Sequence, residues 1–273
     1  FADRDGNPRP VGAAADLGAD ESADPAIVRY VAVGGTGDAP CTDFRFPCPT
    51  LQLALDAASD GDLIKMAGGT FTGVRNDDGR IHHARVVKNV TIQGGYFPRT
   101  DDNAVTEGLF TDHDWEDPHP DLNPTVIDVA NQGRGFWISD GATPVIASIT
   151  IRRGNASALG DGPAGSSGGA GGGIFVENAA PILRDVIVQE STAVYGGGLY
   201  LATAGGDYRG LLLTNNQATW GGGLYVEGGA PLVEGVTLQA NRAITGAGAV
   251  VDGGSATLRA NTLLDNGDAS TLD

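Results

Sequence analysis

Apolar residues recur along the second half of the chain at intervals of 25 residues, with polar residues and glycines between them. One of these apolar columns consists of Val186, Leu211 and Val236, and its next position is the polar residue Asn261. Within each period the apolar positions form three short runs without the 3.6-residue stripes of a helix, which indicates β-strands. The two longest columns are Leu183, Tyr208, Val233 and Leu258, and Val188, Leu213, Leu238 and Leu263.

Each period also contains a run of glycines that is followed by an aliphatic and usually an aromatic residue. These runs begin at Gly171, Gly196 and Gly221, and a degenerate copy begins at Gly246. Glycine and asparagine suit the turns between strands. A fixed period of this length is typical of a solenoid, so the sequence predicts an all-β solenoid whose coils stack about 4.8 Å apart. An asparagine column with the same spacing consists of Asn216, Asn241 and Asn266, with Ser191 in the preceding period.

The first part of the chain carries one clear helix signal. Residues 50–58 have Thr50 at the N-cap position and an apolar face formed by Leu51, Leu55 and Ala58. A helix ahead of the first coil would cover the open end of the solenoid. The expected strands of the first half lie at 27–33, 63–67, 85–92, 125–129, 135–138 and 145–151. The expected division of the chain is an N-terminal segment at 1–25, a cap at 26–62 and coils at 63–273, with insertions near 96–124 and 155–170.

The composition limits the partners of the chain. It has 273 residues and a formal net charge of −17, which argues against nucleic acid and anionic membranes as partners. The longest apolar runs are far shorter than a membrane span, so no membrane insertion is expected. The sequence begins at Phe1 without a signal peptide, and we interpret it as a mature or trimmed form of an exported protein. No cofactor is expected, although the negative charge would attract divalent cations such as Ca²⁺.

Cys41 and Cys48 are the two cysteines of the chain, and prolines flank both of them. They form either a local disulfide or two free buried thiols, and the short separation favours the disulfide. A disulfide would place the protein in an oxidising compartment. A zinc site would need more Cys or clustered His residues than the chain contains.

Several motifs cover nearly the whole chain: residues 30–37, the loop between the cysteines, residues 55–65, 69–73 and 92–97, and the glycine-block coils. Through them the chain resembles right-handed parallel β-helix proteins of the pectin-lyase-like superfamily, especially bacterial surface proteins with Gly-Gly-aliphatic-Tyr repeats. The resemblance implies a right-handed parallel β-helix with an N-terminal capping helix, located outside the cell or on its surface. It says little about activity, because this fold carries many functions.

The order of two segments departs from that family. Residues 3–10 and 16–21 resemble the end of a β-helix domain, yet here they precede the cap. The chain is therefore either a piece of a tandem array cut at an arbitrary point, or a unit whose residues 1–25 complete the open end of a neighbouring copy. Closure of the two ends within one chain is disfavoured, because a rod holds its ends far apart. The expected contacts between copies involve Phe1, Asp3, Asp5, Pro8, Arg9, Leu17, Leu258, Leu263 and Leu264.

The polar residues give a weak signal for chemistry. Lyases of the superfamily use carboxylates that hold Ca²⁺ and a basic residue on one outer face of the helix. The nearest candidates here form no column at the 25-residue spacing, so solvated surface charge is the favoured interpretation and no catalytic residue is assigned. These candidates are Asp128, Asp140, Arg152, Arg153, Asp185 and Glu234.

Two groups of residues suggest a ligand. The cluster of His113, Trp115 and His119 would suit a metal or a sugar, with an ordinary insertion loop as the favoured alternative. Stacked aromatic residues offer a carbohydrate platform as the alternative to a structural role. They are Phe175, Tyr200 and Tyr225 in one column and Tyr195 and Trp220 in another.

Together these patterns predict a non-catalytic structural protein whose partners are copies of itself. The expected assembly is an extracellular filament or stalk, in which the last coil of one unit accepts the N-terminal segment or cap of the next by strand addition. The alternatives are a polysaccharide-active enzyme, either lyase or glycosidase, and a glycan-binding adhesin.

Overall fold

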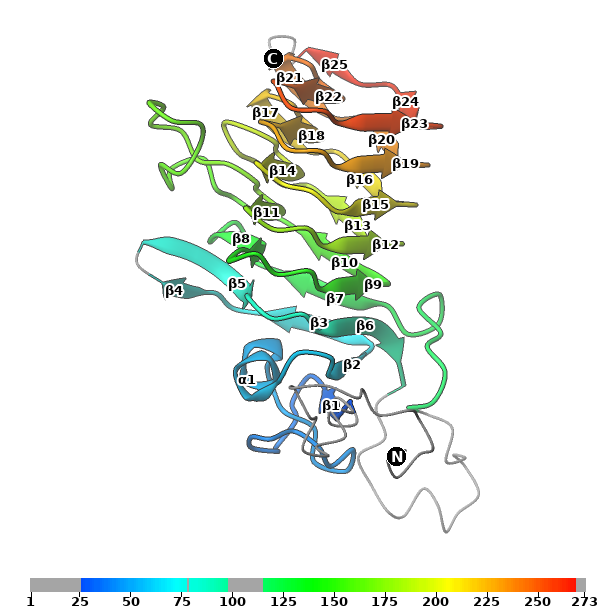
Figure 1. The fold of residues 1–273 in the computed structure, drawn as a ribbon. Coiled ribbons are helices and arrows are strands. Elements are labelled where there is room, and N and C mark those ends of the chain that lie inside the picture. Colours follow the sequence, from blue (N-terminus) through cyan, green and yellow to red (C-terminus); the bar gives the residue numbers. More distant parts are fainter. Residues whose placement is uncertain (1–25, 78, 98–114, 269–273) are drawn as a thin grey trace, which may run out of the picture.

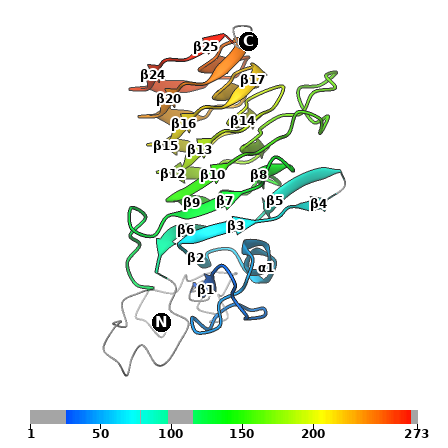
Figure 2. The same cartoon turned by 180° about the vertical axis from the view of Figure 1, so that it is seen from behind.

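The chain folds as a right-handed parallel β-helix, as the sequence predicts. A computed structural model describes residues 26–77, 79–97 and 115–268. Strands stack along a rod, with the cap and α1 (Leu51–Ala57) at one end and the last coil at the other (Figures 1 and 2). Among the described residues all strand pairs are parallel except the hairpin formed by β4 (Arg75–Asp77) and β5 (Arg80–Val86).

Three long sheets and one short sheet line the rod. Sheet 1 contains, in spatial order, β1 (Val28–Val31), β2 (Leu63–Ala67), β6 (Thr91–Tyr96), β9 (Val145–Ala147), β12 (Ile182–Arg184), β15 (Asp207–Arg209), β19 (Leu232–Glu234) and β23 (Thr257–Arg259). Sheet 2 contains β3 (Gly69–Thr72), β7 (Thr125–Asp128), β10 (Ile149–Arg152), β13 (Ile187–Gln189), β16 (Leu212–Thr214), β20 (Thr237–Gln239) and β24 (Thr262–Leu264).

The remaining strands lie on the third side of the rod. Sheet 3 contains β4 (Arg75–Asp77), β5 (Arg80–Val86), β8 (Arg134–Ile138), β11 (Ile174–Glu177), β14 (Leu199–Ala202), β18 (Leu224–Val226) and β22 (Ala249–Val251). Sheet 4 contains β17 (Gln217–Trp220), β21 (Arg242–Thr245) and β25 (Gly267–Asp268). Sheet 4 adds a fourth run to the last coils, where the sequence predicted three.

The 25-residue columns are register columns of the sheets. Leu213 pairs with Val188 on one side and Leu238 on the other, and none of the three is more than 2% exposed. Alternate residues of each strand point into one continuous apolar core, as expected for a strand with a period of two. The predicted columns therefore face inward.

Two predicted strands are wrong in their extent. The strand expected at 85–92 is divided, because β5 ends at Val86 and β6 begins at Thr91, where the chain passes from sheet 3 to sheet 1. The strand expected at 145–151 is divided at Ser148, which has φ 57°. A residue in the left-handed region bends the chain sharply from sheet 1 to sheet 2.

This left-handed bend repeats in every later coil. Five residues at this turn have φ between 51° and 63°: Ser148, Asp185, Gly210, Gly235 and Ala260. Only two of them are glycine, so stacking of successive coils holds the other residues in a conformation that costs roughly 1 kcal/mol or more each. No turn motif in the sequence marks these positions.

The glycine blocks allow the coils to pack closely at their third corner. Gly196 has φ 59°, as the first glycine of each block requires a left-handed conformation. A Cβ atom on Gly197 would collide with the carbonyl oxygens of Gln217 and Gly222 in the next coil. The repeated glycines are therefore explained by backbone packing and require no ligand.

The asparagine column forms a buried ladder of side-chain amides. Asn216 Oδ1 accepts a hydrogen bond from the N–H of Ser191 at 3.0 Å, and Asn216 Nδ2 donates to the carbonyl oxygen of Val188 at 2.9 Å. Asn241 repeats both bonds one coil later. Each amide thus satisfies backbone groups of the turn before it, which a buried turn cannot leave unpaired.

The cap closes the N-terminal end of the core. Thr50 accepts a hydrogen bond from the N–H of Leu53 and so caps the predicted helix, while Leu51, Ala54 and Leu55 are buried. At the other end of the helix, Lys88 Nζ donates to three main-chain carbonyl oxygens, including that of Leu55 at 2.9 Å. These bonds satisfy carbonyls that a helix end leaves free.

Cys41 and Cys48 form a disulfide, with an S–S distance of 2.03 Å, which confirms the favoured interpretation of the sequence. Both residues are at most 1% exposed. Replacing both by serine is expected to lower the free energy of unfolding by about 2 kcal/mol, because the unfolded chain regains the freedom of a short loop. Chemical denaturation of the variant tests this, and mass spectrometry of alkylated native protein should find no free thiol. Free thiols in the native protein would contradict the prediction.

Asp62 ties the cap to the first coil. It is 3% exposed and accepts hydrogen bonds from the N–H groups of Ile27 and Ser59 and from the guanidinium of Arg29. Burial acts to raise the pKa of Asp62, but the bonds from Ser59, Arg29 and Ile27 outweigh it and hold the pKa below its usual range. The ionised carboxylate therefore stabilises the cap.

This depressed pKa predicts acid sensitivity. A carboxyl with a lower pKa in the folded state stabilises the fold above its unfolded pKa of about 3.9, and the contribution is lost as the pH falls through the folded pKa. The denaturation midpoint should drop below about pH 4, and Asp62→Asn should flatten that drop. Asp38→Asn, at an exposed position, serves as the control. An unchanged acid profile in Asp62→Asn would rule out this role.

Within the described residues, no helix is long and apolar enough to cross a bilayer.

Candidate assembly interface

The last coil leaves the apolar core open to solvent. Its core-facing residues on sheets 3, 1 and 2 are Val251, Leu258 and Leu263, which are 47%, 45% and 61% exposed. Their partners in the preceding coil are at most 2% exposed. The sequence places all of these residues in the same columns, so the difference arises from the position of the coil at the end of the stack.

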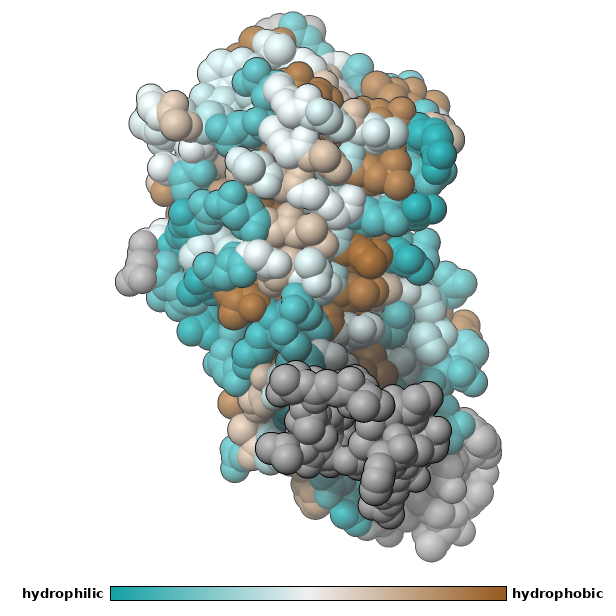
Figure 3. Space-filling model, viewed as in Figure 1, coloured by the Kyte–Doolittle hydropathy of each residue, from teal (hydrophilic) through white to brown (hydrophobic). Residues whose placement is uncertain are grey.

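Two further apolar side chains near this end occupy outward-facing positions of their strands. Ile244 and Leu264 are 66% and 44% exposed. In the described chain twelve large hydrophobic residues are exposed, and five of them lie between residues 244 and 264. Hydrophobic residues are visible at the corresponding end of the rod in Figure 3. We call Ile244, Val251, Leu258, Leu263 and Leu264 the C-terminal face.

The backbone at this end is also open to pairing. β22, β23 and β24 are the last strands of their sheets, and β25 is the last strand of sheet 4. Asn266 Oδ1 accepts a hydrogen bond from the N–H of Asn241 at 3.0 Å. None of the described residues accepts the equivalent hydrogen bond from the N–H of Asn266. An edge of this kind is a template for an added strand.

The sequence-predicted contact residues are only partly described. Leu258, Leu263 and Leu264 lie on the C-terminal face. The other predicted contacts, Phe1, Asp3, Asp5, Pro8, Arg9 and Leu17, lie outside the described residues.

The structure describes only part of the ligand cluster that the sequence suggests at 113–119. Trp115 is 5% exposed and packs against Tyr30 and Tyr96 at centroid distances of 5.0 and 5.9 Å. His119 is exposed and forms backbone hydrogen bonds in the turn that follows, while His113 lies outside the described residues. Trp115 therefore anchors its insertion to the outer face of sheet 1, and its ring is not free to stack on a sugar.

The charged residues considered for catalysis pair with one another. Asp128 is 2% exposed and accepts hydrogen bonds from Arg152 at 2.8 Å and Arg153 at 2.8 and 2.6 Å. Burial acts to raise the pKa of Asp128, but Arg153, the N–H of Ala130 and Arg152 hold it below its usual range. A carboxylate held in this way remains ionised at neutral pH and is a poor general acid.

The other three candidates lie apart from that cluster. Asp140 pairs with Arg85 at 2.8 Å, and Glu234 pairs with Arg209 and Arg259 at 3.0 and 2.6 Å. Asp185 lies in the turn between sheets 1 and 2.

Sheet 3 carries a cluster of charged and aromatic residues that the sequence did not predict. Arg134 is fully buried and binds both oxygens of Asp161 at 2.8 Å, which fixes the insertion at 155–170 to the rod. Arg80 and Arg85 lie on the ring of Trp137, with centroid distances of 4.4 and 4.2 Å. The one sequence feature that could have indicated this cluster is Arg134, which directly precedes the apolar residues of β8.

The aromatic column is covered by its own neighbours. Phe175, Tyr200 and Tyr225 are at most 4% exposed and stack at centroid distances of 5.4 Å. Tyr195 and Trp220 stack on each other at 4.8 Å, nearly parallel. The rings therefore form a second small core outside sheet 3, which is the structural role that the sequence favoured.

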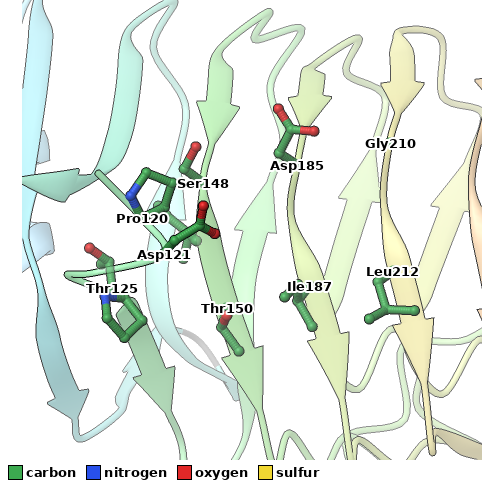
Figure 4. A pocket seen from close by; sticks show the side chains of 11 residues that line it. Pro120, Asp121, Thr125, Ser148, Thr150, Asp185, Ile187, Gly210 and Leu212 are labelled. Carbon is green, nitrogen blue, oxygen red and sulfur yellow. The ribbon is translucent and has the colours of Figure 1, made fainter. Parts of the chain in front are cut away.

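A shallow groove lies on the outer face of sheet 2 (Figure 4). It has a volume of about 360 Å³, with Ile187 and Leu212 along its floor and Pro120 and Asp121 at one edge. Its two carboxylates, Asp121 and Asp185, are both exposed. Pro120 and Pro124 line one side of the groove, and prolines at these positions are the sequence feature that could have indicated a turn there.

Among the described residues, no group of three or more His, Cys, Asp or Glu side chains has an arrangement that would hold a metal ion.

A scan against protein-family models found no match, and searches of curated proteins and of solved structures found none either.

Proposed function

We propose that the chain is a non-catalytic structural unit that assembles head to tail with copies of itself into an extracellular filament or stalk. The observation that carries this proposal is the open core at the C-terminal face, where Val251, Leu258 and Leu263 are about half exposed. Buried apolar surface contributes roughly 25 cal/mol per Å², so covering this face favours association.

Residues 1–25 have a suitable length to cover that face. One coil of the solenoid spans 25 residues, so this segment matches one further coil. It joins the described chain at Ala26, directly before β1 at the opposite end of the rod (Figure 1). A segment laid on the C-terminal face of a neighbour would therefore bring the cap of its own chain to that neighbour.

Contact between two different ends of the same rod gives an open assembly. Such a heterologous interface closes into a ring only if its rotation allows it, and a straight rod favours a filament. Sheet 1 has eight strands, so one added coil gives nine layers and an axial repeat of about 43 Å.

Two further observations support an extracellular setting. The Cys41–Cys48 disulfide fits an oxidising compartment. The motifs that resemble pectin-lyase-like surface proteins lie on the cap and coils of the observed β-helix. We therefore propose that the filament is extracellular or attached to the cell surface.

Deleting residues 1–25 tests the proposal. The intact chain should form filaments in negative-stain images, and the truncated chain should remain a folded monomer by circular dichroism and analytical ultracentrifugation. A peptide of residues 1–25 should shorten filaments of the intact chain by occupying free ends, and a scrambled peptide should not. Filaments of the truncated chain, or an intact chain that stays monomeric, would contradict the proposal.

A further inference from the structure

The cap end of the rod also carries exposed apolar side chains. Ile27, Val33, Phe44 and Phe46 are 44%, 53%, 40% and 55% exposed. Phe44 and Phe46 lie on the loop between β1 and α1, which Figures 1 and 2 place at the end of the rod opposite β22–β25. These four residues and the five of the C-terminal face account for nine of the twelve exposed large hydrophobic residues of the described chain.

The loop that carries the two phenylalanines is held rigidly. The Cys41–Cys48 disulfide closes it, and the N–H groups of Tyr30 and Ala32 donate to the carbonyl oxygens of the two cysteines. Gly35 and Gly37 lack room for a Cβ atom, because it would collide with the main chain at Pro47 and Phe46. Rings held this way lose little conformational freedom on binding, which favours their use as interface anchors.

The charges of the loop do not oppose an apolar contact. Arg45, which lies between the two phenylalanines, pairs with Asp43 at 2.9 Å. Phe44 packs edge-on against Tyr30 at 6.2 Å, which fixes one side of its ring. The exposed part of Phe44 and the ring of Phe46 remain available for a partner.

We infer that Phe44 and Phe46, with Ile27 and Val33, form a surface that packs, together with residues 1–25 of the same chain, against the C-terminal end of a second copy. This inference rests on the proposed head-to-tail assembly and names the other half of its interface. Residues 1–25 join the described chain at Ala26, next to this surface. A segment bound to the last coil of a neighbouring copy would therefore hold this surface beside that coil, which identifies a second copy as the partner. The two faces differ, so each copy presents one of each and the assembly stays open.

Two variants test the inference, and each of them alters one of the two faces and leaves the other unchanged. Phe44→Ser with Phe46→Ser alters the cap face, and Leu258→Lys with Leu263→Lys alters the C-terminal face. Each variant alone should be monomeric by analytical ultracentrifugation, with its assembly threshold raised about tenfold or more. An equimolar mixture should form a dimer, because only one intact pair of faces remains. Leu122→Ser, on the flank of the rod and 79% exposed, is the matched control and should assemble normally.

The outcomes separate the inference from the proposed function. Normal filaments from the phenylalanine variant, together with loss of assembly in the leucine variant, would overturn the inference and leave head-to-tail assembly standing. A dimer formed by either variant alone would show that like faces pair, which would also overturn it. An intact chain that never assembles would remove both proposals. Circular dichroism confirms that each variant is folded.

Discussion

Replacing Leu213 by aspartate is expected to abolish the cooperative unfolding transition of the coils. Leu213 is fully buried at the centre of sheet 2, between Val188 and Leu238. A carboxylate at this position has no partner, and burying an unpaired charge or protonating it to avoid the charge costs several kcal/mol. That cost is comparable with the whole stability of a typical domain, which is about 5–15 kcal/mol.

The neighbouring position provides the control. Thr214 lies on the same strand but points to the outer face, where it is half-buried. Thr214→Asp should unfold with nearly the midpoint of the wild type in urea, while Leu213→Asp should show no native baseline. Two variants with equal stability would show that the 25-residue columns do not determine the core.

Replacing Asn216 by alanine is expected to cause the second largest loss. The N–H of Ser191 and the carbonyl oxygen of Val188 would lose their partners inside the fold, where Ser191 is fully buried. Each buried group left without a partner costs about 1–3 kcal/mol, so the variant should lose about 3 kcal/mol of stability. For a chain of this size the melting temperature should fall by roughly 10 °C.

Asn215→Ala is the matched control, because it removes an adjacent amide without touching the ladder. Asn215 is exposed with φ 55°, and alanine already occupies the same position one coil later, where Ala240 has φ 52°. This variant should remain close to the wild type in thermal unfolding. Equal losses in the two variants would place the effect in the turn and not in the ladder.

Much of the fold follows from local patterns that repeat. The apolar columns predicted the sheets, because a residue that recurs every 25 positions meets its own equivalent in the next coil, as Leu213 meets Leu238. Thr50 marked the start of the helix, since a cap acts on residues three positions away. The cysteine pair predicted its disulfide, because seven residues keep the two side chains close in any compact loop.

Other features depended on contacts that no local pattern encodes. The break at Ser148 arises because stacking forces a left-handed residue at the corner, and serine carries no signal for that conformation. The sequence left a ligand role open for Trp115, and only the fold shows that its ring packs against Tyr30 and Tyr96. Arg134 pairs with Asp161, which lies in the insertion at 155–170, and only the fold brings these two charges together.

The candidate interface shows the same division. The sequence alone determined that Leu258 and Leu263 belong to core columns, because the 25-residue spacing of these two columns continues into the last coil. Only the tertiary structure decided that they are about half exposed while their equivalents are buried, since burial depends on whether another coil lies on top. Likewise, the sequence marked Phe44 and Phe46 only as part of a cysteine loop. The disulfide, the packing of Gly35 and Gly37 and the place of that loop at the end of the rod decided that both rings face outward.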